Sequence, residues 1–325
     1  MNSLYPLKFK PIFKDKIWGG QKIRTELGID FGDLANCGEV WVISGVEGNE
    51  SVVENGFLQG NELNELVEVY MGDLVGEKIF DKFGNEFPLL IKFIDANDWL
   101  SVQVHPDDAL AAKRKIGQGK SEMWYTLGAD NNTQLISGFN REMDKGTYLK
   151  HLKEGTLKDI LNYEDVKKDD VFFIPAGRVH AIGPGMLLAE IQQTSDTTYR
   201  IYDWDRFNEK GVGRDLHTDD AVEAIDFKKH KSYKTTYKSD INKTNGVVMC
   251  DKFITNIVNF DNTIYKDLEA LDSFVIYIAV EGDTILIWDN GEINISKGEA
   301  VIIPAYLSQI ELVPKTTSKL LEVYL

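Results

Sequence analysis

The clearest pattern in the chain is an alternation of apolar and polar residues over positions 100–105. A period of two is typical of a half-buried β-strand, in which every second side chain points the same way. Ser101, Gln103 and His105 therefore share one face, while two valines take the other. A hydroxyl, an amide and an imidazole pack poorly in a dry core, so this face predicts the wall of a wet cavity or a metal site. Pro106 ends the predicted strand.

Elsewhere the hydrophobic pattern predicts many short strands and few helices. Short apolar runs between Gly, Pro and charged turns are typical of strands, whereas helical spacing of apolar residues is confined to a few segments. The expected strands cover residues 9–13, 39–45, 87–94, 100–105, 123–127, 171–183 (two strands around a tight turn) and almost everything from 247 onward, and the expected helices cover 61–72 (with Asn61 as the N-cap), 107–116, 142–161 and 215–225. The chain is thus expected to be mainly β with small helical insertions.

One internal similarity organises these elements. The segment KDDVFFIPA at 168–176 is echoed by KGEAVIIPA at 297–305. A charged turn leads twice into an apolar strand that ends in Pro-Ala, which suggests two copies of one β unit. Many short strands with Gly and Pro turns favour double-sheet jelly rolls of the cupin type. Chance similarity between two strand–turn units is the alternative explanation.

The repeat divides the chain into two expected domains. Residues 1–235 are interpreted as a catalytic cupin domain with helical insertions, and residues 236–325 as a second, degenerate cupin domain without metal. In the register of the repeat, His180 falls opposite Gln309. Because only the first copy keeps an imidazole at this position, chemistry is expected in the first jelly roll alone.

Composition limits the class of partner. A chain of 325 residues is long enough for two cores. Its formal charge of −16, from 36 basic and 52 acidic residues, argues against nucleic acid or an anionic membrane as a partner. Two distant cysteines, Cys37 and Cys250, do not form a disulfide framework, which favours the cytoplasm. The first residues are too polar for a signal peptide, and no apolar run is long enough to span a membrane.

Four residues are candidate ligands of one metal ion. Two imidazoles and a carboxylate with open positions for water or substrate are typical of catalytic zinc sites. An amide oxygen is a weak donor, and Gln is included because it shares a strand face with a histidine two residues away. Without short spacing between them, the same residues are also compatible with ordinary hydrogen-bonded histidines and a solvated carboxylate. The candidates are Gln103, His105, Glu122 and His180.

Basic residues near these candidates could form a local anion site in an otherwise acidic chain. Lys120 lies two residues before Glu122, and Arg200 and Arg206 follow a strand that carries Glu190. Guanidinium and ammonium groups recognise small anions by charge-assisted hydrogen bonds. Surface salt bridges of little energetic value are the alternative role for each of them.

Taken together, these motifs resemble the type I mannose-6-phosphate isomerases (phosphomannose isomerases) of the short bacterial kind, in the cupin superfamily. The resemblance extends over most of residues 5–210 and is weaker in the second unit. It is carried by SVQVHP at 101–106, GKSEM at 119–123, VHA at 179–181 and EIQQTSDTTYR at 190–200, with WGG at 18–20 and GEVW at 38–41 near the N-terminus.

The resemblance implies a two-cupin fold with one Zn²⁺ per chain, bound in the first cupin. The family's metal ligands correspond to Gln103, His105, Glu122 and His180, and its catalytic arginine to Arg200. Its substrate-binding residues correspond to Ser101, Lys120 and Glu190, with Arg206 as a further candidate.

The sequence departs from longer members of the family in several places. Ser121 replaces a proline before the metal-binding Glu, and residues 181–183 replace a bulkier segment that contains tyrosine. Arg206 stands where longer members have a lysine, and their large helical insertion is reduced to about residues 142–161. These departures leave the metal and the chemistry as expected, and they affect the residues that would contact phosphate.

The implied reaction interconverts mannose 6-phosphate and fructose 6-phosphate by proton transfer through an enediol. Arg200 is a poor base because its pKa lies above ~12, so the base is a carboxylate, an imidazole or metal-activated water, with Glu190 the first candidate. The expected partner is a hexose phosphate, and the chain is expected to be a monomer or a weak homodimer. A cupin non-haem iron oxygenase and a non-catalytic bicupin that binds sugar phosphates are the alternative functions.

Overall fold

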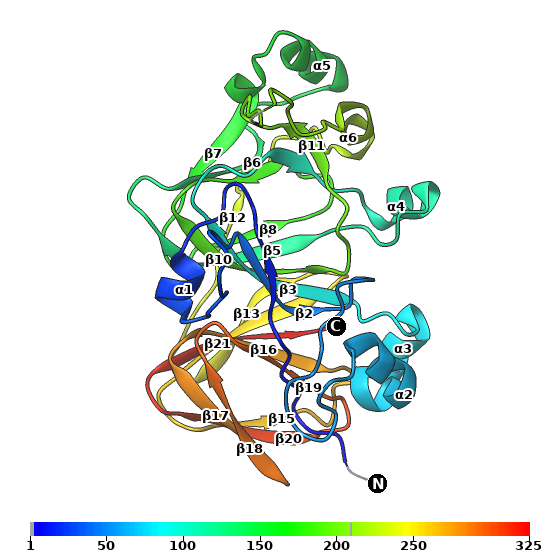
Figure 1. Ribbon diagram of the computed structural model, residues 1–325, viewed down its shortest axis with the longest axis vertical. Helices are drawn as coiled ribbons and strands as arrows, with labels where there is room; N and C mark the ends of the chain where they lie inside the picture. Colours follow the sequence, from blue (N-terminus) through cyan, green and yellow to red (C-terminus); the bar gives the residue numbers. More distant parts are fainter. Residues whose placement is uncertain (1–2, 209) are drawn as a thin grey trace.

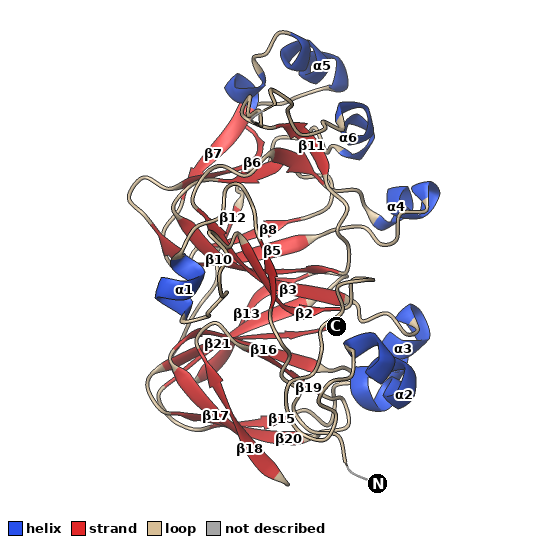
Figure 2. Ribbon diagram, viewed as in Figure 1, coloured by secondary structure: helices blue, strands red, loops and turns tan. Residues whose placement is uncertain are grey.

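The computed structural model describes residues 3–208 and 210–325 and shows an elongated molecule built mainly of strands, with the helices at its margins (Figure 2). The helices are α1 (Lys22–Leu27), α2 (Leu63–Val75), α3 (Glu77–Phe83), α4 (Asp108–Arg114), α5 (Lys145–Lys153), the short 3₁₀ helix η1 (Leu157–Ile160) and α6 (Thr218–Ala224). The strands are β1 (Ile12–Lys14), β2 (Glu39–Ser44), β3 (Leu89–Ala96), β4 (Val102–Val104), β5 (Glu122–Ala129), β6 (Gln134–Phe139), β7 (Leu161–Asp165), β8 (Val171–Ile174), β9 (His180–Ile182), β10 (Met186–Gln193), β11 (Tyr199–Tyr202), β12 (Lys234–Thr235), β13 (Lys243–Met249), β14 (Ile254–Phe260), β15 (Ile264–Asp267), β16 (Val275–Glu281), β17 (Asp283–Trp288), β18 (Gly291–Ser296), β19 (Ala300–Ile303), β20 (Gln309–Pro314) and β21 (Ser318–Tyr324).

The strands form two units with the same topology, stacked one above the other along the long axis (Figure 1). In the first unit, the strand orders β3-β10-β5-β8 and β4-β9-β6-β7 occur in two facing sheets. In the second unit, β14-β21-β16-β19 and β15-β20-β17-β18 repeat the same orders, each strand in its corresponding place. The two similar sequence segments, 168–176 and 297–305, contain β8 and β19 with the turns that precede them. The predicted repeat is therefore confirmed, and the fold is a double jelly roll of the cupin type.

A shared hydrophobic core joins the two units. Because a β-strand alternates its side chains, Leu187, Ala189 and Ile191 of β10 face the second unit. They pack in one cluster with Ile276 and Ile278 of β16. The seven-stranded sheet of the first unit is therefore buried on both faces, and its strands contain almost no exposed residues.

The opposite face of β10 points into the first unit and is partly polar. Leu188 belongs to the apolar cluster of this interior, and Glu190 and Gln192 follow on the same face. The valines of β4 pack outward, under α5 and α6, in a separate cluster. The alternation at residues 100–105 thus places its polar side chains between the two sheets, as the sequence predicts.

Two local predictions are corrected. Helix α2 begins at Leu63 with Glu62 as its N-cap, because Glu65 accepts a hydrogen bond from the Glu62 backbone N–H at 3.1 Å, whereas the Asn61 side chain donates to a loop carbonyl. The helix predicted over 142–161 is interrupted at Gly155, whose φ of +68° ends α5 before η1.

Within the described residues, no helix is long and apolar enough to cross a membrane.

The shared core yields a test of how the units depend on each other. Phe274 is fully buried, and its ring centroid lies 4.7 Å from that of Phe87 in the first unit. We expect Phe274→Ala to destabilise the protein by about 3–5 kcal/mol and to lower the temperature of one joint unfolding transition, measured by calorimetry. The control is Tyr265→Ala, since that side chain is 74% exposed. Two separate transitions, only one of them shifted, would contradict the prediction.

Candidate metal centre and active site

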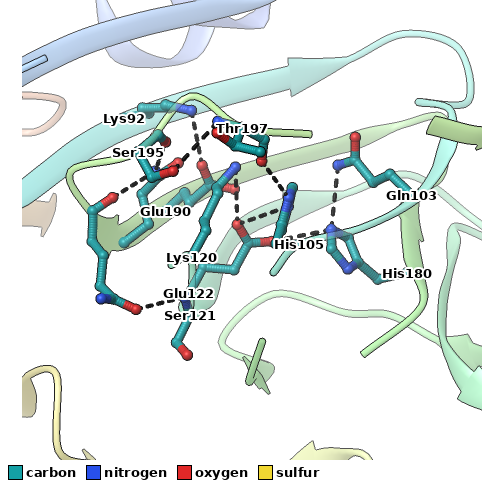
Figure 3. Close-up of polar contacts among 12 residues, drawn as sticks. Lys92, Gln103, His105, Lys120, Ser121, Glu122, His180, Glu190, Ser195 and Thr197 are labelled. Atoms are coloured by element: carbon teal, nitrogen blue, oxygen red, sulfur yellow. Dashed lines mark hydrogen bonds and ion pairs between the residues drawn. The ribbon is translucent and has the colours of Figure 1, made fainter. Parts of the chain in front are cut away.

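Three buried side chains meet between the two sheets of the first unit. His105 directly follows β4, His180 begins β9, and Glu122 begins β5 on the facing sheet. Their possible ligand atoms all lie within 4.8 Å of one another (Figure 3). Glu122 Oε1 is 3.3 Å from His180 Nε2, and its Oε2 is 3.6 Å from His105 Nε2. The structure thus brings together three of the four predicted metal ligands.

The backbone fixes the orientation of both imidazoles. Nδ1 of His105 lies 2.9 Å from the carbonyl oxygen of Thr197, and Nδ1 of His180 lies 2.8 Å from that of Arg178. A carbonyl only accepts hydrogen bonds, so each Nδ1 carries the proton and donates it. Each Nε2 therefore presents its lone pair toward Glu122, which is the arrangement that metal-binding histidines require.

The polar atoms at the centre of this group fit a metal cation. His105 Nε2 and both carboxylate oxygens of Glu122 are buried and have no hydrogen-bond partner. Unpartnered polar atoms are costly in a protein interior, and a divalent ion would satisfy all three at once. Two imidazoles and one carboxylate match the donor set of a catalytic zinc site.

Gln103 lies beside this group. It pairs with His180 across β4 and β9, and its Nε2 is 3.2 Å from His180 Nε2. A half-turn of the amide brings Oε1 to the same place without changing the shape of the side chain. The fourth predicted ligand is therefore within reach of the cluster.

Burial sets the protonation of the cluster. Desolvation lowers the pKa of His180 to about 4 and that of His105 well below its usual value, so both rings are neutral at pH 7. Desolvation raises the pKa of Glu122 to about 7, and the charge of Glu190 adds to this effect while Lys120 opposes it. The site thus offers two neutral nitrogen donors and one carboxyl that must release a proton to bind a cation.

A second buried group of charges adjoins the candidate metal ligands. Lys120 Nζ is 3.3 Å from Glu122 Oε2. Glu190 accepts a 2.9 Å hydrogen bond from Trp124 Nε1 and pairs with Lys92 Nζ at 3.2 Å. Burial raises the pKa of Glu190, but the positive charges of Lys92 and Lys120 lower it by more. The pKa therefore lies below its usual value. Glu190 is therefore an ionised carboxylate in the interior of the first unit (Figure 3).

Two members of this group were not predicted from the sequence. Lys92 is 4% exposed and also lies 3.7 Å from Glu39 Oε2. Glu39 in turn accepts a 2.7 Å hydrogen bond from Trp41 Nε1. The sequence did contain a signal, because Lys92 interrupts the apolar run of β3, where a charge must have a buried partner.

Arg200 extends the polar face of the sheet. It pairs with Gln103 across β11 and β4, so the two side chains lie on the same face. One terminal nitrogen donates to the carbonyl of Asp215 at 2.7 Å, while Nε is buried without a partner. Ser101 is 4% exposed and precedes Gln103 by two residues. Both predicted residues are thus adjacent to the candidate metal ligands.

Arg206, unlike Arg200 and Ser101, is held by acidic residues and a main-chain carbonyl. Its terminal nitrogens donate to Asp203 Oδ1 at 2.6 Å and to the carbonyl of Trp99 at 2.7 Å, and one lies 3.4 Å from Asp98 Oδ2. Its Nε also faces the Asp203 carbonyl at 3.3 Å. These contacts occupy the guanidinium and leave few donors for a phosphate.

The fold and the site together define a double-cupin protein with a two-His, one-Glu cluster in its first unit. Residues 6–133 match the family model of the phosphomannose isomerase type I catalytic domain. The mannose-6-phosphate isomerase ManA of Bacillus subtilis is 34% identical over 316 residues, which cover 94% of this chain and 95% of that protein. The mannose-6-phosphate isomerase of Streptococcus mutans is 39% identical over 224 residues, 68% of this chain and 67% of that protein.

A solved structure agrees over the whole length. The crystal structure of mannose 6-phosphate isomerase from Bacillus subtilis has a TM-score of 0.88 with this chain at 30% identity, covering 98% of this chain and 99% of that one. The chain belongs to the type I mannose-6-phosphate isomerase family of enzymes.

Removal of one imidazole tests the ligand set. We expect His180→Ala to lose both bound metal and activity, because one neutral nitrogen donor is removed from a buried site. Metal content is measured by elemental analysis of the purified protein. His151→Ala is the control, since that histidine bonds Thr156 next to α5 and contacts none of the proposed ligands. Stoichiometric metal in His180→Ala would show that the ligand assignment is wrong.

Metal uptake should be linked to the proton on Glu122. Its raised pKa of about 7 keeps it mostly protonated at pH 6, whereas the histidines are already neutral there. We expect about one proton released per metal ion at pH 6, and progressively fewer above pH 7. Calorimetric titration of chelator-stripped protein with Zn²⁺, in buffers of different ionisation enthalpy, measures this number. Release of two protons at pH 6, or an unchanged release at pH 8, would contradict it.

Proposed function

We propose that this chain is a zinc-dependent isomerase that interconverts mannose 6-phosphate and fructose 6-phosphate through an enediol. The observation that carries the proposal is the convergence of two backbone-oriented imidazoles on the buried carboxylate of Glu122. Membership of the family supports the substrate and reaction. Bound zinc would supply a Lewis acid for the substrate oxygens that become negative in the reaction.

The residues around the cluster have distinct roles in this proposal. Arg200 carries a permanent positive charge on the same sheet face as Gln103 and stabilises the enediolate. Glu190 is the base that moves the proton between C1 and C2, because it is buried and ionised. Lys92 and Trp124 orient Glu190 through its two oxygens. Lys120 and Ser101 donate hydrogen bonds to the substrate's hydroxyl groups.

Burial contributes to the chemistry in its own right. Lys120, Glu122 and Glu190 are each at most 5% exposed. Charges act more strongly on one another where water is excluded, and an enediol so enclosed is protected from side reactions. Enclosure between two sheets therefore serves the proposed reaction as well as metal binding.

We propose that residues 1–235 form the catalytic domain and residues 236–325 a domain that does not bind metal. In the described residues, β12 is the last strand to join the sheets of the first unit, and β13 is the first to join those of the second. Gln309 pairs with Asp267 as His180 pairs with Gln103. Val275 takes the place of Glu122, so the second unit lacks the imidazole and the carboxylate at these positions.

A coupled assay of mannose 6-phosphate conversion to fructose 6-phosphate tests the proposal. We expect turnover that a chelator abolishes and added Zn²⁺ restores. Arg200→Ala should lower kcat by at least about a hundredfold while one zinc per chain remains, because the arginine acts on the substrate and not on the metal.

Arg141→Ala, which removes an exposed arginine, is the control for loss of charge. Normal turnover in Arg200→Ala would refute the role of this residue. Oxygen consumption with bound iron, or hexose phosphate binding without turnover, would instead support the oxygenase or the non-catalytic alternative.

A further inference from the structure

A row of polar side chains crosses the five-stranded sheet of the first unit at the level of the metal ligands. Strand pairing places Arg200 beside Gln103, Gln103 beside His180, and His180 beside Ser137 of β6. Directly paired residues in antiparallel strands point to the same face. The row therefore lines the interior from β11 to β6, with the metal ligands in the middle and a hydroxyl at the far end.

Arg178 ends this row. It lies in the turn between β8 and β9, two residues before His180, and is 7% exposed. One terminal nitrogen lies 3.4 Å from Ser137 Oγ, and the guanidinium stacks on Tyr233 with its central carbon 4.8 Å from the ring centroid. Its main-chain carbonyl is the group that orients His180.

This guanidinium has too few partners for its burial. Within residues 3–208 and 210–325, Ser137 is its one side-chain hydrogen-bond partner, and no carboxylate forms an ion pair with it. Buried charges are normally paired with an opposite charge, because desolvation is costly otherwise. Asp226, the acidic residue beside the turn, is engaged by His230 Nε2 at 2.9 Å and by the backbone of Lys228. Most of the five guanidinium N–H donors are thus available to an anionic ligand.

We propose that Arg178, with Ser137, binds the phosphate group of the sugar phosphate. A guanidinium matches phosphate in geometry and charge better than any other side chain. The assignment rests on the proposed function, because it takes the other end of the same substrate to be held at the metal. Neighbouring strands are ~4.8 Å apart, so Ser137 and Arg178 lie one step beyond His180, where a group distant from the reacting carbons can reach.

The arginine that the family resemblance favours is less suited to this role. Arg206 is already held by Asp203, Asp98 and the carbonyl of Trp99, whereas Arg178 has one neutral partner. Lys120 lies at the metal end of the site, with its Nζ 3.3 Å from Glu122 Oε2. Among these basic groups, Arg178 gains the most from an incoming anion.

The test compares Arg178→Gln with Arg141→Gln, which removes the same charge from an exposed site on the chain that leaves β6. We expect Arg178→Gln to raise KM for mannose 6-phosphate about tenfold to a hundredfold, with kcat changed less than about threefold and zinc retained. Inhibition by inorganic phosphate should weaken by a similar factor. Arg141→Gln should leave both constants unchanged.

Unchanged KM and phosphate inhibition in Arg178→Gln would overturn the proposal, as would a KM increase confined to Arg206→Gln. If Arg178→Gln does not fold, judged by its melting temperature, Arg178→Met replaces it, because methionine fills the same space against Tyr233. Failure of the proposed function can be distinguished from failure of the Arg178 assignment, because the wild-type protein would then show no turnover. Phosphate binding by the zinc-loaded wild type and variant, measured by calorimetry, still tests Arg178 in that case.

Discussion

The buried carboxylate of Glu122 is the constraint on which the first unit depends. Both of its oxygens are enclosed without a hydrogen-bond partner, and such a group is stable in a protein interior only when protonated or matched by a cation. The surrounding side chains supply groups that can bind a cation beside this carboxylate or pair with it directly. Two imidazoles are turned by main-chain carbonyls so that their lone pairs meet at the carboxylate, and Lys120 stands beside it. The candidate metal site follows from this constraint.

The wider cluster shows how the charge of the interior is set. Three carboxyl groups, Glu39, Glu122 and Glu190, alternate with two ammonium groups, Lys92 and Lys120. A divalent cation added to this set makes its total charge positive while the protein as a whole is strongly acidic. This interior can therefore attract an anion although the chain as a whole is acidic, because local charge rather than net charge governs binding in an enclosed site.

The second unit also buries a carboxylate, Glu322, between its strands. Glu322 pairs with Tyr277 across β21 and β16 as Glu190 pairs with Trp124 across β10 and β5. Its oxygens accept hydrogen bonds from Tyr277 and Asn256, and it also forms an ion pair with Lys266. The two copies of the scaffold therefore each bury a carboxylate at this position, paired with Lys92 in the first unit and with Lys266 in the second.

The sequence by itself determined the residue types, the period of two that turns them inward, and the repeat that doubles the fold. These are local properties: alternation and turn chemistry depend on neighbours in the chain, so Gln103, His105 and the Pro-Ala echo could be interpreted without a structure. It also contained Lys92 and Arg178. The apolar run around Lys92 indicates that this lysine is buried, but no local pattern identifies the distant partners of either residue. Only the tertiary structure decided that Lys92 forms ion pairs with both Glu190 and Glu39. It also decided that, among the described residues, the guanidinium of Arg206 is paired with carboxylates, whereas that of Arg178 is not. Those outcomes depend on strand pairing and sheet packing between residues far apart in sequence, which also fix the proton on each imidazole and the burial that shifts every pKa in the site.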